Sequence, residues 1–175
     1  MAPRTDSFDL ARLKLSSGEG RRLDLAAPVE PLRYGNAEYR VQPDPVGVRV
    51  DVSRTTHHGW ALRLRFCAHL QGPCMRCLEP AVPEIEVDAR EVDQPGAGDD
   101  ELSSPYVADG DLDLHGWVRD ALALALPTTL LCRADCAGLC PQCGADLNLA
   151  GDDHFHPREP DPRWAALREL KLPGE

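Results

Sequence analysis

The cysteines of this 175-residue chain are the residues whose type and spacing indicate chemistry. Six of the seven fall into three closely spaced pairs: Cys74 and Cys77, Cys132 and Cys136, and Cys140 and Cys143. Two cysteines separated by two residues in a tight turn direct both thiolates toward one point, which suits half of a tetrahedral zinc site. The third pair reads Cys-Pro-x-Cys-Gly, a pattern typical of a zinc knuckle. The sequence therefore predicts metal binding, with zinc as the cofactor.

Two histidines complete the set of donors. His154 and His156 follow the third cysteine pair and alternate onto one side of an extended chain. With the six paired cysteines they make eight donors, the number that two tetrahedral zinc sites require. We predict that one site ties the β region to the helical half of the chain and that the other is local. The first would use Cys74, Cys77, Cys132 and Cys136, and the second Cys140, Cys143, His154 and His156.

The spacing leaves other arrangements open. Two further groupings are a ribbon of Cys74, Cys77, Cys140 and Cys143, and a local cluster of Cys132, Cys136, Cys140 and Cys143. The second of these sets could also hold an iron–sulfur cluster. The two histidines could belong to a solvated loop. Cys67 lies within a strand-like run and has no nearby cysteine, so we expect a small, half-buried side chain rather than a ligand.

The same motifs disfavour an enzyme. Structural zinc sites are closed by four protein ligands, whereas catalysis needs an open position and a positioned base. A thioredoxin-like Cys-x-x-Cys would open a helix, yet Cys74 lies between strand-like runs. The chain has neither a phosphate-binding glycine loop nor a nucleophile elbow. We therefore expect no catalytic residues and no small-molecule substrate.

The elements that must position these ligands begin with a strand-rich region. Hydrophobic residues alternate with polar ones in residues 46–52, 60–66 and 82–92, and Pro43-Asp-Pro45 is a turn signal. Short connections between such runs indicate an antiparallel β-meander or a partly open barrel. The predicted fold class is α+β, with this β region followed by two helices and Cys-rich zinc-binding turns.

The helices and boundaries follow from capping residues and composition. Asp113 can cap a helix that runs to about Leu126, and a last helix is expected over residues 161–173. Residues 8–13 fit either a strand or a short helix. We expect a mainly β region at 1–92, a mobile acidic loop at 93–113, and a helical and zinc-knuckle region at 114–175, all packed as one domain.

Charge and hydropathy limit location and partners. The formal net charge is −10, and residues 93–175 hold six basic and sixteen acidic residues, so this part of the chain should repel RNA and attract basic proteins. The apolar runs are too short to span a membrane and the N-terminus lacks a signal-peptide pattern, so we expect a cytoplasmic protein without a membrane partner. A basic surface for RNA could come only from the N-terminal half, from Arg21, Arg22, Arg33, Arg40, Arg49 and Arg54.

The ordered set of motifs resembles the bacterial YceD family, the large ribosomal RNA subunit accumulation proteins. The resemblance covers about residues 60–172 and rests on five segments: Cys74-Met-Arg-Cys77 with Pro80, an acidic loop, Asp113-Leu with the ALALALP run, residues 132–147, and residues 161–167. It implies a cytoplasmic factor needed for 23S rRNA accumulation and linked to large-subunit assembly. Family members often have Cys-x-Cys where this chain has His154-Phe-His156, and imidazole can replace thiolate on zinc.

Two functions from different classes therefore stand. The first is a non-enzymatic zinc-binding factor in ribosome biogenesis whose partner is the large-subunit precursor, either through its rRNA or through a basic ribosomal protein. The net charge favours the protein partner. The alternative is a zinc–thiol regulatory or redox-responsive module.

Overall fold

The computed structural model describes residues 5–94, 102–151, 154–157 and 163. They belong to two compact units, Met1–Cys136 and Ala137–Glu175, and each is described by itself. Packing of the whole chain as one domain stays a prediction. Across the described segments, no helix has the length and apolar character needed to cross a membrane.

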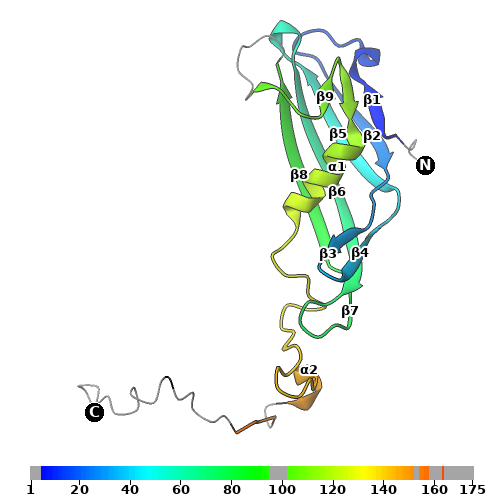
Figure 1. Ribbon diagram of the computed structural model, residues 1–175. Helices are drawn as coiled ribbons and strands as arrows, with labels where there is room; N and C mark the ends of the chain where they lie inside the picture. The colour runs from blue at the N-terminus through cyan, green and yellow to red at the C-terminus, as the bar shows by residue number, and fades with distance from the viewer. Residues whose placement is uncertain (1–4, 95–101, 152–153, 158–162, 164–175) are drawn as a thin grey trace. The chain divides into compact units, whose positions relative to one another are not determined.

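The first unit is built around one long antiparallel strand, β6, that pairs on both of its sides (Figure 1). β5 and β4 pair with one side, with β2 beyond β5 and β3 beyond β4. β8 and the two-residue β7 pair with the other side in a single register. The seven strands are β2 (Gly20–Ala27), β3 (Leu32–Tyr34), β4 (Ala37–Gln42), β5 (Val46–Arg54), β6 (Trp60–Pro73), β7 (Pro80–Ala81) and β8 (Glu84–Asp93).

The connection between β4 and β5 is a bulge rather than the turn that Pro43-Asp-Pro45 suggested. Gln42 pairs with His69 and Arg49 with Arg65, so three extra residues separate the two pairings on the β4–β5 side. Proline has no amide to donate to a strand ladder and is tolerated where the ladder is interrupted. The sheet is therefore not the simple meander expected, because β4 and β5 both pair with β6. Its curling into a partly open barrel stays a prediction.

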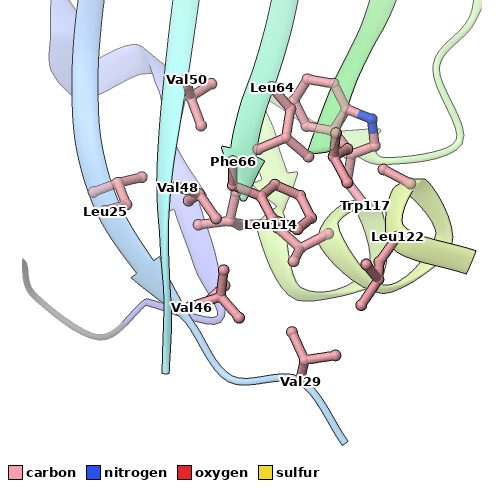
Figure 2. Close-up of a cluster of buried hydrophobic side chains, with 14 of the residues drawn as sticks. Leu25, Val29, Val46, Val48, Val50, Leu64, Phe66, Leu114, Trp117 and Leu122 are labelled. Carbon is pink, nitrogen blue, oxygen red and sulfur yellow. The ribbon is translucent and has the colours of Figure 1, made fainter. Parts of the chain in front are cut away.

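The core lies between one face of this sheet and α1 (Leu114–Ala125), which packs against it (Figure 2). The predicted helix is confirmed, and so is its cap, since the Asp113 carboxylate accepts the Gly116 amide at 2.9 Å. The predicted inward face of β6 is also confirmed, because four alternating side chains are buried: Trp60, Leu62, Leu64 and Phe66.

A second, three-stranded sheet contains residues that we expected in the acidic loop. β1 (Ser7–Asp9) pairs with β10 (Asp111–Asp113), which pairs with β9 (Val107–Ala108). Residues 107–113 are therefore not a mobile loop. Leu112 is fully buried opposite Phe8, and this non-local pairing orders a polar segment that has little local propensity. Residues 8–13 form both elements suggested by the sequence, since β1 leads into the 3-10 helix η1 (Leu10–Leu13).

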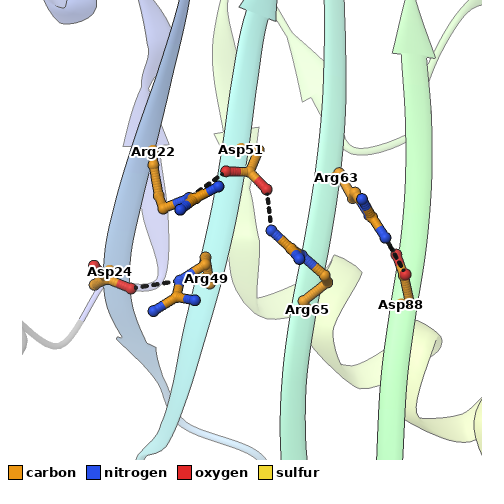
Figure 3. A network of polar contacts seen from close by, with 7 residues as sticks. All are labelled: Arg22, Asp24, Arg49, Asp51, Arg63, Arg65 and Asp88. Atoms are coloured by element: carbon orange, nitrogen blue, oxygen red, sulfur yellow. Dashed lines mark hydrogen bonds and ion pairs between the residues drawn. The ribbon is translucent and has the colours of Figure 1, made fainter.

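The face of the large sheet opposite α1 is covered by charged side chains (Figure 3). A hydrogen bond from Arg22, and to a smaller extent one from Arg65, lowers the pKa of the Asp51 carboxyl. These contacts neutralise charge on both partners, so most arginines of this face do not offer free positive charge. Four ion pairs join side chains of neighbouring strands: Arg22 with Asp51, Arg65 with Asp51, Arg49 with Asp24, and Arg63 with Asp88.

The second unit has a short helix, α2 (Leu147–Ala150), that the sequence did not predict as an element of its own. Asp146 caps it by accepting the Asn148 amide, and Leu139 bridges to Asp146. The helix predicted over residues 161–173 falls outside the described residues except for Arg163. Antiparallel sheets with helices confirm the α+β class.

Candidate metal centres

The first Cys-x-x-Cys sequence forms a tight turn directly after β6. The Cys74 amide donates to the Glu79 carbonyl at 2.8 Å, and the Leu78 amide donates to the Cys74 carbonyl at 3.0 Å. Leu78 adopts the left-handed conformation, with φ of 65°. The Arg76 amide lies 3.4 Å from the Cys74 Sγ, as an amide that donates to a thiolate would. The turn therefore places both thiols on one side.

The end of β6 holds this turn in place. The Tyr39 hydroxyl donates to the Pro73 carbonyl at 3.0 Å, next to Cys74. The Tyr39 ring lies against Gly72 so closely that a Cβ at that position would collide with it. Glycine is therefore required here by close packing rather than by an unusual backbone angle.

The chain that follows α1 brings the second pair of thiols to the turn. The Met75 amide donates to the Leu130 carbonyl at 2.8 Å, and Leu130 is 1% exposed. The Arg76 guanidinium donates to the Cys136 carbonyl at 2.9 Å. These contacts fix the segment that carries Cys132 and Cys136.

The four thiols of this first centre lie at distances that fit one tetrahedral ion. All four Sγ atoms lie within 4.8 Å of one another. The Sγ atoms of Cys74 and Cys136 are 3.8 Å apart, and those of Cys77 and Cys132 are 3.6 Å apart. Zinc–sulfur bonds of about 2.3 Å in a tetrahedron imply sulfur separations of about 3.8 Å. The set is free thiols, not disulfides, and its donor chemistry fits zinc.

Burial and backbone hydrogen bonds shift the pKa values of Cys74 and Cys77 in opposite directions. Burial raises the pKa of Cys74, but hydrogen bonds from the backbone of Cys77, Arg76 and Cys132 outweigh it and lower the pKa to about 6. The Glu79 backbone lowers the pKa of Cys77, yet burial and the neighbouring thiols raise it to about 12. Because the thiols of this centre lie close together, a bound cation would stabilise their thiolate forms.

The second Cys-x-x-Cys sequence repeats the same turn in the second unit. The Cys140 amide donates to the Ala145 carbonyl, and the Gly144 amide donates to the Cys140 carbonyl, both at 2.8 Å. Gly144 has a φ of 75° and stands where Leu78 stands in the first turn. A glycine accepts this left-handed conformation with little cost, whereas leucine does not.

His154 and His156 join the second turn to form a second centre. The Nε2 atoms of His154 and His156 lie 3.5 and 3.3 Å from the Cys143 Sγ, and 3.0 Å from each other. The two imidazole and two thiol donors lie within 4.8 Å of one another. These separations fit a tetrahedral site with two sulfur and two nitrogen donors.

The second centre is more exposed than the first. Cys143 is exposed and the two histidines are partly buried, whereas in the first centre only Cys132 is exposed. Hydrogen bonds from the Cys143 backbone, His154 and the Gln142 backbone lower the pKa of Cys140 to about 6. The described residues thus contain the two groupings we favoured, and ligation by these eight residues stays a prediction.

Cys67 lies outside both centres, and its expected half-burial is wrong. It is exposed on the charged face of β6, because it alternates with the buried Phe66 and Ala68. Its thiol donates to the Glu84 carboxylate at 2.9 Å. This hydrogen bond, partial desolvation of the sulfur and the charges of Glu84 and Glu86 raise the pKa of Cys67 to about 11. It remains a protonated thiol at neutral pH.

Sequence reasoning missed two residues that support the first centre. Arg76 stands between Cys74 and Cys77 and holds the segment of the second cysteine pair by donating to the Cys136 carbonyl. Met75 beside it bonds the same segment through its amide to Leu130. Nothing in the spacing of the cysteines distinguishes these two intervening positions from ordinary exposed turn residues.

Comparison with known proteins shows the family to which this chain belongs. The family model described as large ribosomal RNA subunit accumulation protein YceD matches residues 62–171. The chain belongs to the YceD family. The matched range starts in β6 and includes every predicted ligand of both centres.

Curated relatives come from actinobacteria and from a plant. The chain is 38% identical over 107 residues to an uncharacterized protein of Mycobacterium tuberculosis, covering 58% of this chain and 51% of the relative. It is 36% identical over 190 residues to the chloroplastic large ribosomal RNA subunit accumulation protein YCED homolog 1 of Zea mays, covering 87% and 62%. The chain spans about half the length of the mycobacterial relatives it matches. No solved structure matches it.

Proposed function

We propose that this protein is a non-catalytic, zinc-binding factor of the cytoplasm that supports accumulation of 23S rRNA and assembly of the large ribosomal subunit. The observation that carries the proposal is the family match over residues 62–171, a range that includes both clusters of thiol and imidazole donors. The Zea mays relative is named as a large ribosomal RNA subunit accumulation protein.

Zinc would have a structural role. The ligands would be Cys74, Cys77, Cys132 and Cys136 in one centre and Cys140, Cys143, His154 and His156 in the other. Four protein donors per ion leave no open position for a substrate or an activated water. The ions would supply positive charge that allows several closely packed thiols to exist as thiolates. The chain itself would orient the sulfurs by the backbone hydrogen bonds of the two turns.

The partner would be the large-subunit precursor, approached through a basic ribosomal protein rather than through exposed rRNA. Support comes from the arginines that could have formed an RNA surface. Four of the six are in ion pairs, and the Arg54 guanidinium lies 4.1 Å from the centre of the Trp60 ring. A phosphate backbone would have to compete for the ion-paired arginines. Those pairs are Arg22 with Asp51, Arg33 and Arg40 with Glu38, and Arg49 with Asp24.

The test is complementation of a bacterial strain that lacks its own YceD-family protein. We expect the wild-type chain to restore the ratio of 23S to 16S rRNA and to co-sediment with large-subunit precursors. Cys77→Ser should fail in both assays, whereas Cys67→Ser, the same change at a cysteine outside the centres, should complement fully. A normal rRNA ratio in the strain that lacks the protein, or complementation by Cys77→Ser, would reject the proposal.

A zinc–thiol redox-responsive module is the second candidate, and the exposure of Cys143 in the second centre favours it. Oxidation of exposed thiolates releases bound zinc and is reversible at the disulfide stage. Reversible release of one zinc per chain by mild peroxide, with a matching change in rRNA accumulation, would support this candidate. Release without such a change would reject it.

A further inference from the structure

Strand β8 forms one edge of the large sheet (Figure 1). Its ten residues pair with β6 in one uninterrupted register, from Glu84 opposite His69 to Asp93 opposite Trp60. Within the described residues, β8 has no strand on its other side. A free edge of this length offers a row of unpaired backbone groups to an added strand.

The register identifies which backbone groups face outward. The Leu70 amide donates to the Pro83 carbonyl, so the odd-numbered residues of this strand bond to β6. The even-numbered residues must then direct their amides and carbonyls to the open side. Gln94 agrees with this, since its amide donates outward to the Leu102 carbonyl at 2.7 Å. Five outward residues precede it along the strand: Glu84, Glu86, Asp88, Arg90 and Val92.

The edge lacks most of the features that block strand addition. Residues 84–93 contain no proline, glycine or lysine, and their ladder with β6 has no bulge. What the edge does present is negative charge. Glu84 and Glu86 are exposed and, in the part of the chain that the structure describes, neither forms an ion pair, while Asp88 is paired with Arg63.

The acidic side chains select the kind of strand that fits. A second copy of β8 paired with the first would bring carboxylates together, which is destabilising, whereas opposite charges on adjacent strands contribute about 0.2–1 kcal/mol per pair. The alternate residues Ile85 and Val87 face the buried side of the sheet. An added strand would therefore carry basic residues on its outer side and apolar or small residues on its inner side.

We propose that the β8 edge binds an extended, basic segment of a partner protein by strand addition. The segment has arginine or lysine at alternate positions, facing Glu84 and Glu86. This inference deepens the proposed function and rests on it only for the source of the partner, a basic ribosomal protein. Binding of the segment itself needs no ribosome and is testable on the isolated zinc-loaded chain.

The experiment measures fluorescence anisotropy with a labelled ten-residue peptide in which arginine and valine alternate. We expect the wild-type chain to bind it and to bind a peptide with the same composition, but with the arginines in one block, at least about tenfold more weakly. Methylation of alternate peptide amides on the bonding side should also reduce the affinity by about tenfold or more, because it removes backbone donors. Equal binding of the methylated peptide would overturn the proposal, since charge alone would then explain it.

Variants at Glu86 separate the backbone contribution from the charge contribution. Glu86→Pro removes one outward amide without removing a bond to β6, so it should weaken peptide binding by about tenfold. The double variant Glu84→Lys with Glu86→Lys should lose the arginine peptide and gain a peptide of alternating glutamate and valine. Melting temperature and zinc content report whether each variant is folded. The gain by the double variant keeps the test decisive if Glu86→Pro is unstable.

Matched controls lie on the opposite edge strand, β2. The Thr5 amide donates to the Ala26 carbonyl, so the even-numbered residues of β2 also face outward. Asp24→Pro and Asp24→Lys should therefore leave peptide affinity within about twofold of wild type. Loss of peptide binding in these controls would reject the β8 edge as the binding site. The β8 edge would also be rejected if an rRNA fragment displaced the peptide and bound the wild-type chain and the double lysine variant equally well. Normal rRNA accumulation with the double lysine variant would also reject this edge as the working surface, while leaving the proposed function intact.

Discussion

The two Cys-x-x-Cys turns share a backbone conformation and differ in what surrounds them. In both, the first cysteine bonds to the residue five positions later, and the residue four positions later adopts the left-handed conformation. The first turn contacts two cysteines that are 55 and 62 residues away in the chain, next to a buried core. The second contacts two histidines that are only 11 and 13 residues from Cys143, and its donors are less buried than those of the first.

This difference teaches that the same ligand turn can serve two purposes. A cross-link that closes a long loop removes more conformational freedom from the unfolded chain than one that closes a short loop. Burial also restricts access of chelators and oxidants to the ligands. The first centre should therefore determine stability, and the second should determine how readily one ion exchanges.

Disrupting one centre at a time should give the largest difference in melting temperature between variants. Cys77→Ser should lower the melting temperature by about 10 °C or more, because structural zinc binding contributes about 10–16 kcal/mol and fold stability is about 5–15 kcal/mol. His156→Ala should lower it by about 3 °C or less and affect mainly residues 140–156. Differential scanning calorimetry measures both, and equal shifts would contradict the division of roles.

Removal of metal should reveal the same division in kinetics. We expect two zinc ions per chain by elemental analysis, with donors for each given by one cluster. A chelator with a colorimetric zinc readout should remove one ion at least about tenfold faster than the other, because the donors of the second centre are less buried than those of the first. His156→Ala should abolish the fast phase and leave the slow one. A stoichiometry near one, a single phase, or the absorption band of an iron–sulfur cluster would contradict the assignment.

Cys67 offers a comparison between an exposed thiol and the thiols of the centres. Its pKa is raised to about 11 by Glu84, so little thiolate exists at pH 8 and iodoacetamide should react slowly despite the exposure. Glu84→Gln lowers the pKa toward its usual range and should speed alkylation by up to about tenfold, since a lower pKa also reduces nucleophilicity. Mass spectrometry of tryptic peptides measures the rate at Cys67. An unchanged alkylation rate would show that the Glu84 carboxylate does not raise the pKa of the Cys67 thiol.

The smallest expected effect comes from making the two turns alike. Leu78 is 66% exposed and has a φ of 65°, a conformation that costs leucine about 1–2 kcal/mol. Leu78→Gly should therefore stabilise the protein by about 0.5–1 kcal/mol after the entropy of glycine is subtracted. The reverse change, Gly144→Leu, should be destabilising. Urea denaturation measures both, and a loss of stability in Leu78→Gly would mean that the Leu78 side chain packs usefully.

Local patterns predicted the elements whose own sequence determines them. The helix capped by Asp113 and the inward face of β6 follow from periodicity and capping, and both are confirmed. The alternation that buries Phe66 also places Cys67 on the exposed face. The exposure of Cys67 could therefore have been predicted from the strand pattern of residues 60–66. The bulge at Pro43–Pro45 could not, because it depends on which strand pairs with β4.

Non-local pairings account for the rest. Strands β9 and β10 are short and pair with each other, and β10 also pairs with β1, which lies about a hundred residues earlier in the chain. The spacing of the cysteines gave the half-sites, but several groupings were compatible with it. The grouping depends on hydrogen bonds between distant segments, such as that from Met75 to Leu130. A pattern of residue types along the chain carries no information about such contacts.

The separation of 62 residues between Cys74 and Cys136 also sets an order of events during synthesis. The β6 strand and its partner β8 are complete at Asp93, and the first turn closes through its own backbone bonds. At about 5–20 residues per second, synthesis of the 62 residues from Cys74 to Cys136 takes on the order of 3–12 s. During that interval the nascent chain displays a two-thiol half-site. Completion of the four-thiol cluster is consequently a late step of synthesis, because Cys132 and Cys136 follow α1 in the chain.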